Sequence, residues 1–209
     1  KRRFQNPMKR EDNGQGATSL ATVAPRSGMR YISPMLRQRD RTGSGRGVME
    51  IDWEFFGELC RGLALKIAKD FDPEIVLGVT KAGVIPGVVV ASILQRDFAT
   101  IAITRPGGRR RPTLLEGPPE ALSGLRVLIV DETCDSGDTL KVARAAVKKS
   151  GPAEIRTAVS FQTGGYAPDY HALATENFII LPWDREVVVD DELIVRPEYA
   201  ARLGSDALG

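Results

Sequence analysis

Two adjacent carboxylates, Asp131 and Glu132, stand between a short apolar run and a polar turn. Small residues in such a turn let backbone N–H groups close around an anion, and an acid pair suits sugar hydroxyls or a hydrated Mg²⁺. The stretch therefore predicts a site for a phosphorylated sugar. The turn residues are Asp135, Ser136, Gly137, Asp138 and Thr139.

Two regular elements must hold this turn in place. Val127 to Val130 form a continuous apolar run rich in β-branched residues, which predicts a strand buried on both faces of a parallel sheet. Leu140 to Lys149 have helical composition, and Gly151-Pro152 end the segment. The turn then lies at the amino terminus of a helix, where the helix dipole favours negative charge.

The order of residues from Val127 to Thr139 resembles the signature of the type I phosphoribosyltransferases: four apolar residues, two acids, two variable residues, then Asp/Thr-Thr/Ser-Gly-x-Thr. This resemblance implies an enzyme that transfers the 5-phosphoribosyl group of phosphoribosyl pyrophosphate to a nucleobase and releases pyrophosphate. It also implies that residues 135–139 hold the 5-phosphate, that Asp131 and Glu132 hold the ribose with Mg²⁺, and that Asp135 is the general base.

A second turn falls where the same family holds pyrophosphate. It follows a predicted strand at 74–80 and precedes a predicted helix at 85–94 with Pro86 in its first turn. The resemblance implies a non-proline cis peptide bond between Lys81 and Ala82. Alone the motif is weak, since many turns between strands and helices contain Lys and Gly. Its residues are Thr80, Lys81, Ala82 and Gly83.

The segment 105–123 is rich in Gly, Pro and Arg and has no period of its own, which predicts a long loop. The family has a mobile loop here that closes over the active site. One arginine of this loop can reach pyrophosphate on closure, and a solvated basic loop is an equal alternative for each. The candidates are Arg105, Arg109, Arg110 and Arg111.

The segment from Phe178 to Asp184 resembles the aromatic-x-x-x-Pro-Trp-Asp segment of bacterial and archaeal purine phosphoribosyltransferases. That resemblance implies that Phe178 stacks on the base and that the backbone of Ile179 reads the base edge. It also implies that Asp184 binds a second Mg²⁺ through water, while Trp183 packs. Phe178 as an ordinary core residue is the alternative.

Position 162 departs from the purine pattern, because the purine enzymes place a Lys there to donate to the 6-oxo group of the base. Gln162 can donate or accept but supplies no charge, and it accommodates a 6-amino base more readily. The sequence therefore supports the sugar donor more strongly than it supports a particular base.

The whole pattern predicts an α/β fold with a mostly parallel central sheet of about five strands, flanked by helices, with a small C-terminal hood. Asp52 is the expected cap of an amphipathic helix that includes Trp53, Phe56 and Ile67. Further strands are expected at 98–104, 154–162 and 177–181. A loop is expected at 163–175, where His171 is structural or exposed.

Residues 1–47 are predicted to be a basic, mostly disordered tail, and residues 48–209 the phosphoribosyltransferase domain. Residues 1–48 contain 11 basic and 3 acidic residues, whereas the whole chain has a net charge of only +2. The tail is expected to be solvated, with contact to nucleic acid as the alternative. No apolar run is long enough to span a membrane.

Two widely spaced cysteines indicate no disulfide framework, so a cytoplasmic setting is expected. Cys134 is expected to be a small filler, with a reactive thiol as the alternative. The family implies a homodimer. The rival function is a non-catalytic regulator that senses phosphoribosyl pyrophosphate and contacts nucleic acid or a protein through the tail.

Overall fold

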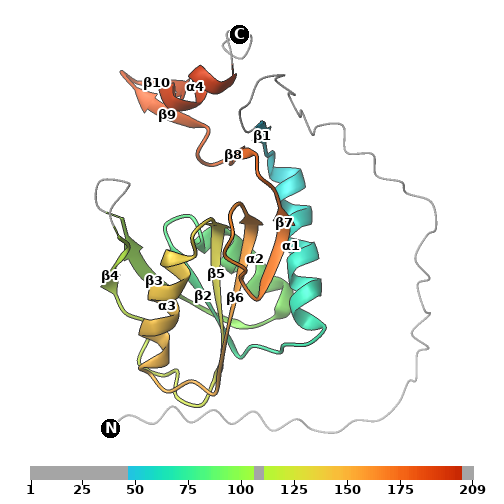
Figure 1. Cartoon of the computed structure of the whole chain (residues 1–209), viewed down its shortest axis with the longest axis vertical. Coiled ribbons are helices and arrows are strands. Elements are labelled where there is room, and N and C mark those ends of the chain that lie inside the picture. Colours follow the sequence, from blue (N-terminus) through green and yellow to red (C-terminus); the bar gives the residue numbers. More distant parts are fainter. Residues whose placement is uncertain (1–46, 106–110, 204–209) are drawn as a thin grey trace, which may run out of the picture. The chain divides into compact units, whose positions relative to one another are not determined.

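The computed structural model describes residues 47–105 and 111–203. Within these residues the central sheet has six strands in the order β4-β3-β2-β5-β6-β7 (Figure 1). All its pairs are parallel except β3 with β4, which is antiparallel at one edge. The predicted mostly parallel α/β fold is confirmed, with one strand more than expected. The strands are β2 (Ile75–Thr80), β3 (Asp97–Thr104), β4 (Thr113–Glu116), β5 (Arg126–Cys134), β6 (Glu154–Gln162) and β7 (Tyr170–Ala174).

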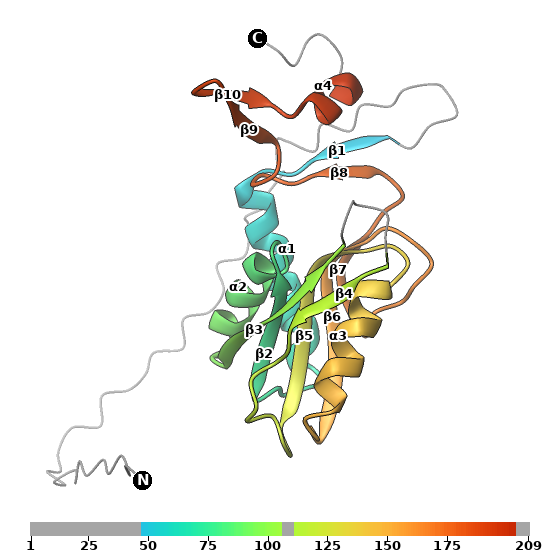
Figure 2. The same ribbon diagram turned by 90° about the vertical axis from the view of Figure 1, so that its left-hand side faces the viewer.

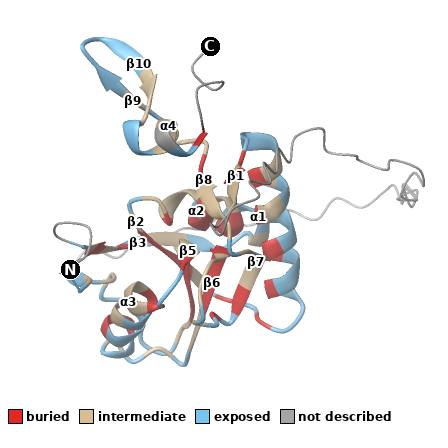
Figure 3. Cartoon of the chain, turned by 45° about the horizontal axis from the view of Figure 1, so that its top comes forward, coloured by how far each residue is buried: buried red, intermediate tan, exposed pale blue. Residues whose placement is uncertain are grey.

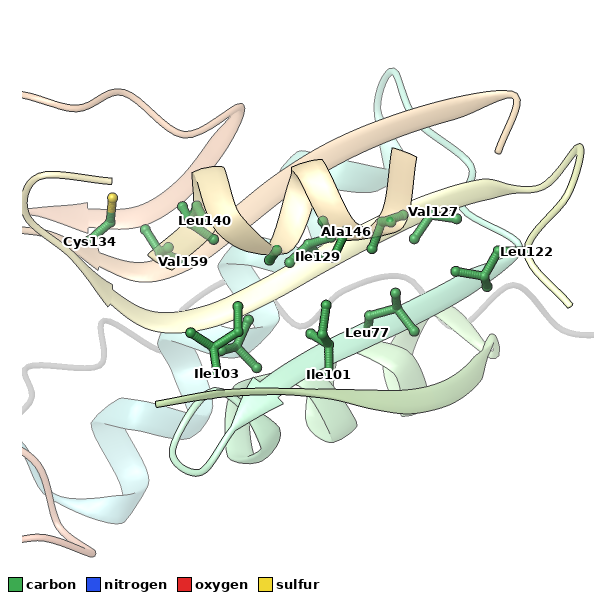
Figure 4. Packing of buried hydrophobic residues seen from close by; sticks show 13 residues of the cluster. Leu77, Ile101, Ile103, Leu122, Val127, Ile129, Cys134, Leu140, Ala146 and Val159 are labelled. Atoms are coloured by element: carbon green, nitrogen blue, oxygen red, sulfur yellow. The ribbon is translucent and has the colours of Figure 1, made fainter. Parts of the chain in front are cut away.

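The apolar run that precedes the acid pair forms the centre of the sheet, and its side chains alternate between the two faces. Val127 and Ile129 pack against helix α3 (Asp138–Lys148), together with Leu77 of β2 (Figure 4). Leu128 and Val130 pack toward the opposite helices. Because both faces are covered, the strand needs apolar residues at every position, which explains the unbroken run in the sequence.

Two helices cover that opposite face. α1 (Trp53–Ala68) begins after Asp52, whose Oδ1 accepts a hydrogen bond of 2.7 Å from the backbone N–H of Phe55. α2 (Val84–Leu94) follows the Lys81 turn and contains Pro86 in its first turn. The predicted cap and both predicted helices are confirmed. Figure 3 shows the buried residues of these helices in red.

A small hood lies beyond the carboxyl ends of the strands (Figure 2). β1 (Val48–Glu50) pairs in parallel with β8 (Phe178–Ile180), and β9 (Glu186–Val189) forms a hairpin with β10 (Glu192–Val195). The short helix α4 (Pro197–Leu203) completes it. Met49 and Leu181 join the hood to Phe56 and Cys60 of α1 in one buried cluster. The predicted C-terminal hood is therefore present.

Two elements differ from the predictions. β4 lies within the segment expected to be a loop, and β7 lies within the expected loop at 163–175. All four residues of β4 are exposed, so it carries no alternating apolar pattern. β7 is short and is placed by pairing with β6, which fixes Tyr170 opposite Ala158. Pairing decided both strands, and pairing partners are not visible in a local sequence window.

Most of the predicted basic tail, together with Arg109 and Arg110, lies outside the described residues. Among the residues that are described, no helix is long and apolar enough to cross a membrane.

Candidate active site

The acid pair lies at the carboxyl end of β5, inside the strand rather than after it. Asp131 pairs with Val159 of β6 and is only 7% exposed, whereas Glu132 is half-buried. The backbone N–H of Glu132 donates a 3.0 Å hydrogen bond to Oδ1 of Asp131. Burial, and then the neighbouring Glu132 carboxylate, raise the pKa of Asp131 well above its usual range. A cation or a sugar hydroxyl bound at this edge would stabilise the ionised form of Asp131, which burial and Glu132 disfavour.

The Lys81 turn packs directly against the acid pair. A Cβ atom on Gly83 would lie 2.7 Å from Oδ1 of Asp131 and 2.7 Å from the carbonyl oxygen of Val79, so only glycine fits this contact. Lys81 itself is exposed at the same edge. The cis peptide bond joins Thr80 to Lys81, one residue before the position that the resemblance implied.

The predicted phosphate loop connects β5 to α3. Gly137 adopts φ +74° at the residue before the helix, and it provides no side-chain cap to the first N–H groups of α3. Lys141 donates 3.0 Å hydrogen bonds to the backbone carbonyl of Ser136 and to Oδ1 of Asp138. The bond from Lys141 to the Asp138 carboxylate lowers the pKa of Asp138. The loop is therefore a tight turn in which the side-chain hydrogen bond to a first-turn N–H is long, from Asp138 N–H to Oγ of Ser136 at 3.4 Å.

Residues 163–166, which follow β6, pack against this loop. A Cβ atom on Gly137 would lie 2.1 Å from Cγ of Tyr166, which shows that the tyrosine ring packs against the glycine. The backbone N–H of Tyr166 donates 3.3 Å to the carbonyl oxygen of Asp135, and Thr163 N–H donates 2.8 Å to that of Cys134. The ammonium of Lys141 lies 5.2 Å from the centre of the Tyr166 ring. The phosphate loop is thus clamped between α3 and residues 163–166.

Of the two arginine candidates that the structure describes, Arg105 and Arg111, the first lies at this loop. Its Nε and one terminal nitrogen donate to Oγ1 of Thr139 at 3.2 and 2.8 Å. Arg105 also contributes positive charge near Asp131. Arg111 is exposed, and its carbonyl oxygen accepts a bond of 3.5 Å from Thr113. Arg105 therefore brings a cation between the phosphate loop and the acid pair.

The residues predicted to bind the base lie on two different elements. Gln162 ends β6, and its amide donates 3.3 Å to the carbonyl oxygen of Gly164. It lines a pocket of about 590 Å³ together with Thr175 and Glu176. Phe178 and Ile179 lie in β8, and both are half-buried. Among the described residues, Phe178 belongs to no buried cluster, and its ring contacts Tyr199 with ring centres 5.7 Å apart.

Asp184 is engaged by protein groups. Its Oδ1 lies 2.9 Å from a guanidinium nitrogen of Arg196, and its Oδ2 accepts a hydrogen bond from the hydroxyl of Tyr199. Burial, and then this bond, raise the pKa of Tyr199. A water-mediated magnesium contact at Asp184 would share these two oxygens with Arg196 and Tyr199.

Cys134, Trp183 and His171 each contact other groups of the protein. Cys134 is 3% exposed in the core, and burial raises the pKa of its thiol to about 11, which agrees with a small filler. Trp183 packs edge to face on Phe56, with ring centres 4.8 Å apart. The backbone carbonyl of His171 accepts from Lys66 at 2.9 Å. Within the described residues, no cluster of three metal-binding side chains is present.

Sequence reasoning missed Tyr166 and the residues of α4. A signal was present for the first, because Gly164-Gly165-Tyr166 combines two glycines with an aromatic residue. Glycines next to an aromatic residue can mark a close backbone approach, and here a Cβ on Gly164 would overlap Asp135. No comparable signal marks α4, whose contacts depend on how the hood folds back.

Comparisons with known proteins agree with this geometry. The sequence model of the family described as phosphoribosyl transferase domain matches residues 52–191. The xanthine-guanine phosphoribosyltransferase of Cereibacter sphaeroides is 28% identical over 116 residues, which cover 52% of this chain and 68% of that protein.

Solved structures are similar too. The purine phosphoribosyltransferase from Pyrococcus horikoshii is 29% identical with a TM-score of 0.61, covering 68% of this chain and 98% of that one. The xanthine-guanine-hypoxanthine phosphoribosyltransferase of Helicobacter pylori shares the fold at 19% identity and a TM-score of 0.57, covering 65% of this chain and 93% of that one. With the acid pair, the phosphate loop and the Lys81 turn gathered at one edge of the sheet, this chain belongs to the phosphoribosyl transferase domain family and is a phosphoribosyltransferase.

Proposed function

We propose that this protein transfers the 5-phosphoribosyl group of phosphoribosyl pyrophosphate to a ring nitrogen of a purine base and releases pyrophosphate in a Mg²⁺-dependent reaction. One observation carries the assignment: Gly83 of the Lys81 turn packs on Asp131, while β5 continues from Asp131 into the phosphate loop. Groups suited to pyrophosphate, ribose and 5-phosphate therefore follow one another along the carboxyl edge of the sheet, where open α/β sheets bind ligands.

The proposed roles follow from the position of each group. The backbone N–H groups of residues 135–139 and the hydroxyls of Ser136 and Thr139 bind the 5-phosphate. Asp131 and Glu132 bind the ribose hydroxyls, and the Thr80–Gly83 turn binds pyrophosphate. Arg105 adds a cation beside Thr139, 2.8 Å away.

Magnesium fits the acid pair as a partial site. Asp131 and Glu132 supply the oxygen ligands that Mg²⁺ prefers, and the described residues gather no third acidic or imidazole ligand around them. Waters and substrate oxygens would complete the coordination, which is typical of Mg²⁺ bound with a phosphorylated substrate. When bound, the ion would neutralise charge on the pyrophosphate.

The reaction needs positioning and charge stabilisation rather than a covalent nucleophile. A base nitrogen forms a bond to C1 of the ribose as the bond from C1 to the pyrophosphate oxygen breaks. Asp135 is the proposed acceptor of the proton lost by the base nitrogen. It is exposed beside Gly164, and its backbone carbonyl is held by Tyr166, so its carboxylate starts from a fixed backbone position.

The acceptor is proposed to be a purine because the two relatives of 28% and 29% identity are named for purine substrates. Phe178 is the proposed stacking platform, the backbone of Ile179 reads the base edge, and Gln162 faces the 6-substituent. Gln162 offers a neutral amide there, so we expect weaker preference for a 6-oxo group than a Lys would give.

Turnover of a base panel tests the proposal. Adenine, hypoxanthine, guanine, xanthine and uracil are each incubated with phosphoribosyl pyrophosphate and Mg²⁺, and pyrophosphate release is measured. Release with at least one purine and none with uracil is expected. Release with uracil alone would contradict the purine assignment, and loss of activity on chelation would support the role of Mg²⁺.

The neutral amide of Gln162 favours one second candidate, a regulator that binds phosphoribosyl pyrophosphate without turnover. In that case calorimetry would show binding of phosphoribosyl pyrophosphate while no base in the panel releases pyrophosphate. Light scattering of the purified chain tests the homodimer expected from the family. A cytoplasmic setting stays part of the proposal.

A further inference from the structure

The helix α4 is fixed next to the proposed base platform. Arg196, immediately before the helix, and Tyr199, within it, both bind the carboxylate of Asp184. Asp184 follows β8 by only a few residues, so these bonds hold α4 to the segment that carries Phe178. The contacts across this segment are therefore set by the fold of the hood.

Two side chains of α4 contact the ring of Phe178. Tyr199 packs edge on, with ring centres 5.7 Å apart and an angle of 67° between planes. The guanidinium carbon of Arg202 lies over the ring, 4.2 Å from its centre. Arg202 is exposed, and it forms no ion pair with any residue that the structure describes. Within the described residues, Arg202 therefore contacts the aromatic ring rather than a carboxylate.

A guanidinium over an aromatic ring is the kind of surface on which a nucleobase stacks. Bases stack on both aromatic rings and arginine planes, and arginine also stacks directly on aromatic faces. At 4.2 Å the two groups are in contact, so a base could enter between them only if the guanidinium withdrew by about 3.5 Å, one van der Waals spacing. An exposed arginine can do this by changing rotamers, with no movement of α4.

We propose that the acceptor base binds between Phe178 and Arg202, stacked on the ring on one side and on the guanidinium plane on the other. This inference rests on the proposed function, because it takes Phe178 as the base platform. It identifies Arg202 as a residue that determines affinity for the base. Stacking tolerates changes at the base edge, so Arg202 contributes similarly to all purines, and Gln162 distinguishes their 6-substituents.

The test compares three variants in steady-state kinetics with each purine that the wild type uses. Arg202→Ala should raise the KM for every such base about 5- to 160-fold, the range for one stacking contact with a base. The KM for phosphoribosyl pyrophosphate should stay within about twofold. Arg202→Lys keeps the charge but loses the plane, so it should resemble Arg202→Ala. Arg61→Ala, an exposed arginine of α1 paired with Glu58, is the matched control and should change neither KM.

Three results would overturn the inference. An unchanged or lower KM for the base in Arg202→Ala would mean that the guanidinium only covers an empty platform. Full rescue by Arg202→Lys would show that charge matters rather than stacking. An equal rise in both KM values, with a lower denaturation midpoint, would assign Arg202 to stability.

Failure of the proposed function would be seen separately, as absence of pyrophosphate release by the wild type with the whole base panel. In that case calorimetric titration of a purine nucleoside 5′-monophosphate into wild type and Arg202→Ala still decides the inference. Weaker binding by the variant supports the sandwich, and equal binding rejects it.

Discussion

Replacing Gly137 by Ala would test the clamp that holds the phosphate loop. The new Cβ would lie 2.1 Å from Cγ of Tyr166, and the backbone would keep φ +74°, a conformation that residues with a side chain rarely adopt. The left-handed backbone costs about 1–2 kcal/mol. Displacing the ring of Tyr166 costs about 1–3 kcal/mol more, as for other overpacked sites. The free energy of unfolding should therefore fall by about 2–5 kcal/mol, or the loop should open with loss of 5-phosphate binding.

The chain offers a control for each part of that sum. Gly124 has φ +75° and no atom within 4 Å of its added Cβ, so Gly124→Ala measures the backbone cost alone. Gly165 has neither a positive φ nor a close neighbour, so Gly165→Ala should change stability little. In the double variant Gly137→Ala with Tyr166→Ala the overlap with the ring disappears. The double variant should then be about 1–3 kcal/mol more stable than the sum of the single changes predicts.

The assays are urea unfolding and calorimetric titration with phosphoribosyl pyrophosphate. Additive effects of the two substitutions would refute the reasoning, because they would show that the ring and the glycine do not constrain each other. Equal losses in Gly137→Ala and Gly124→Ala would limit the effect to the backbone conformation. If the tyrosine ring supports the loop, the effects of Gly137→Ala and Tyr166→Ala must be non-additive, both for the free energy of unfolding and for the affinity for phosphoribosyl pyrophosphate.

Three further outcomes are expected. Phe178→Ala should raise the KM for the base by a factor that corresponds to about 1–3 kcal/mol of lost stacking. The KM for phosphoribosyl pyrophosphate should rise much less. Equal rises of the two KM values in steady-state kinetics would mean that Phe178 only supports the hood. Replacing Asp131 and Glu132 together by Asn and Gln should abolish Mg²⁺-dependent binding of phosphoribosyl pyrophosphate in calorimetry, and unchanged affinity would remove both from the site. Asp184→Asn should lower the denaturation midpoint, because Tyr199 loses a charged acceptor, while the Mg²⁺ concentration for half-maximal activity stays the same; a large shift in that concentration would instead support the predicted water-mediated magnesium contact of Asp184.

Local sequence patterns predicted much of the fold because burial on both faces leaves a direct record in the chain. The run Val127 to Val130 had to be apolar at every position to pack against α3 on one side and α1 and α2 on the other. Asp52 was recognisable as a cap because its carboxylate binds the first turn of its own helix. β4 and β7 were missed because they exist through pairing with β3 and β6, and neither carries a strong pattern of its own.

The sequence by itself identified the candidate groups of the site, since each is local: the acid pair lies near the end of a strand, and the phosphate loop and the Lys81 turn each follow a strand and precede a helix. Tertiary structure alone decided which groups meet. It placed Gly83 on Asp131, Tyr166 under Gly137 and Arg202 over Phe178. Such contacts join residues far apart in the chain, and they depend on strand order and on the fold of the hood, which no local spacing encodes.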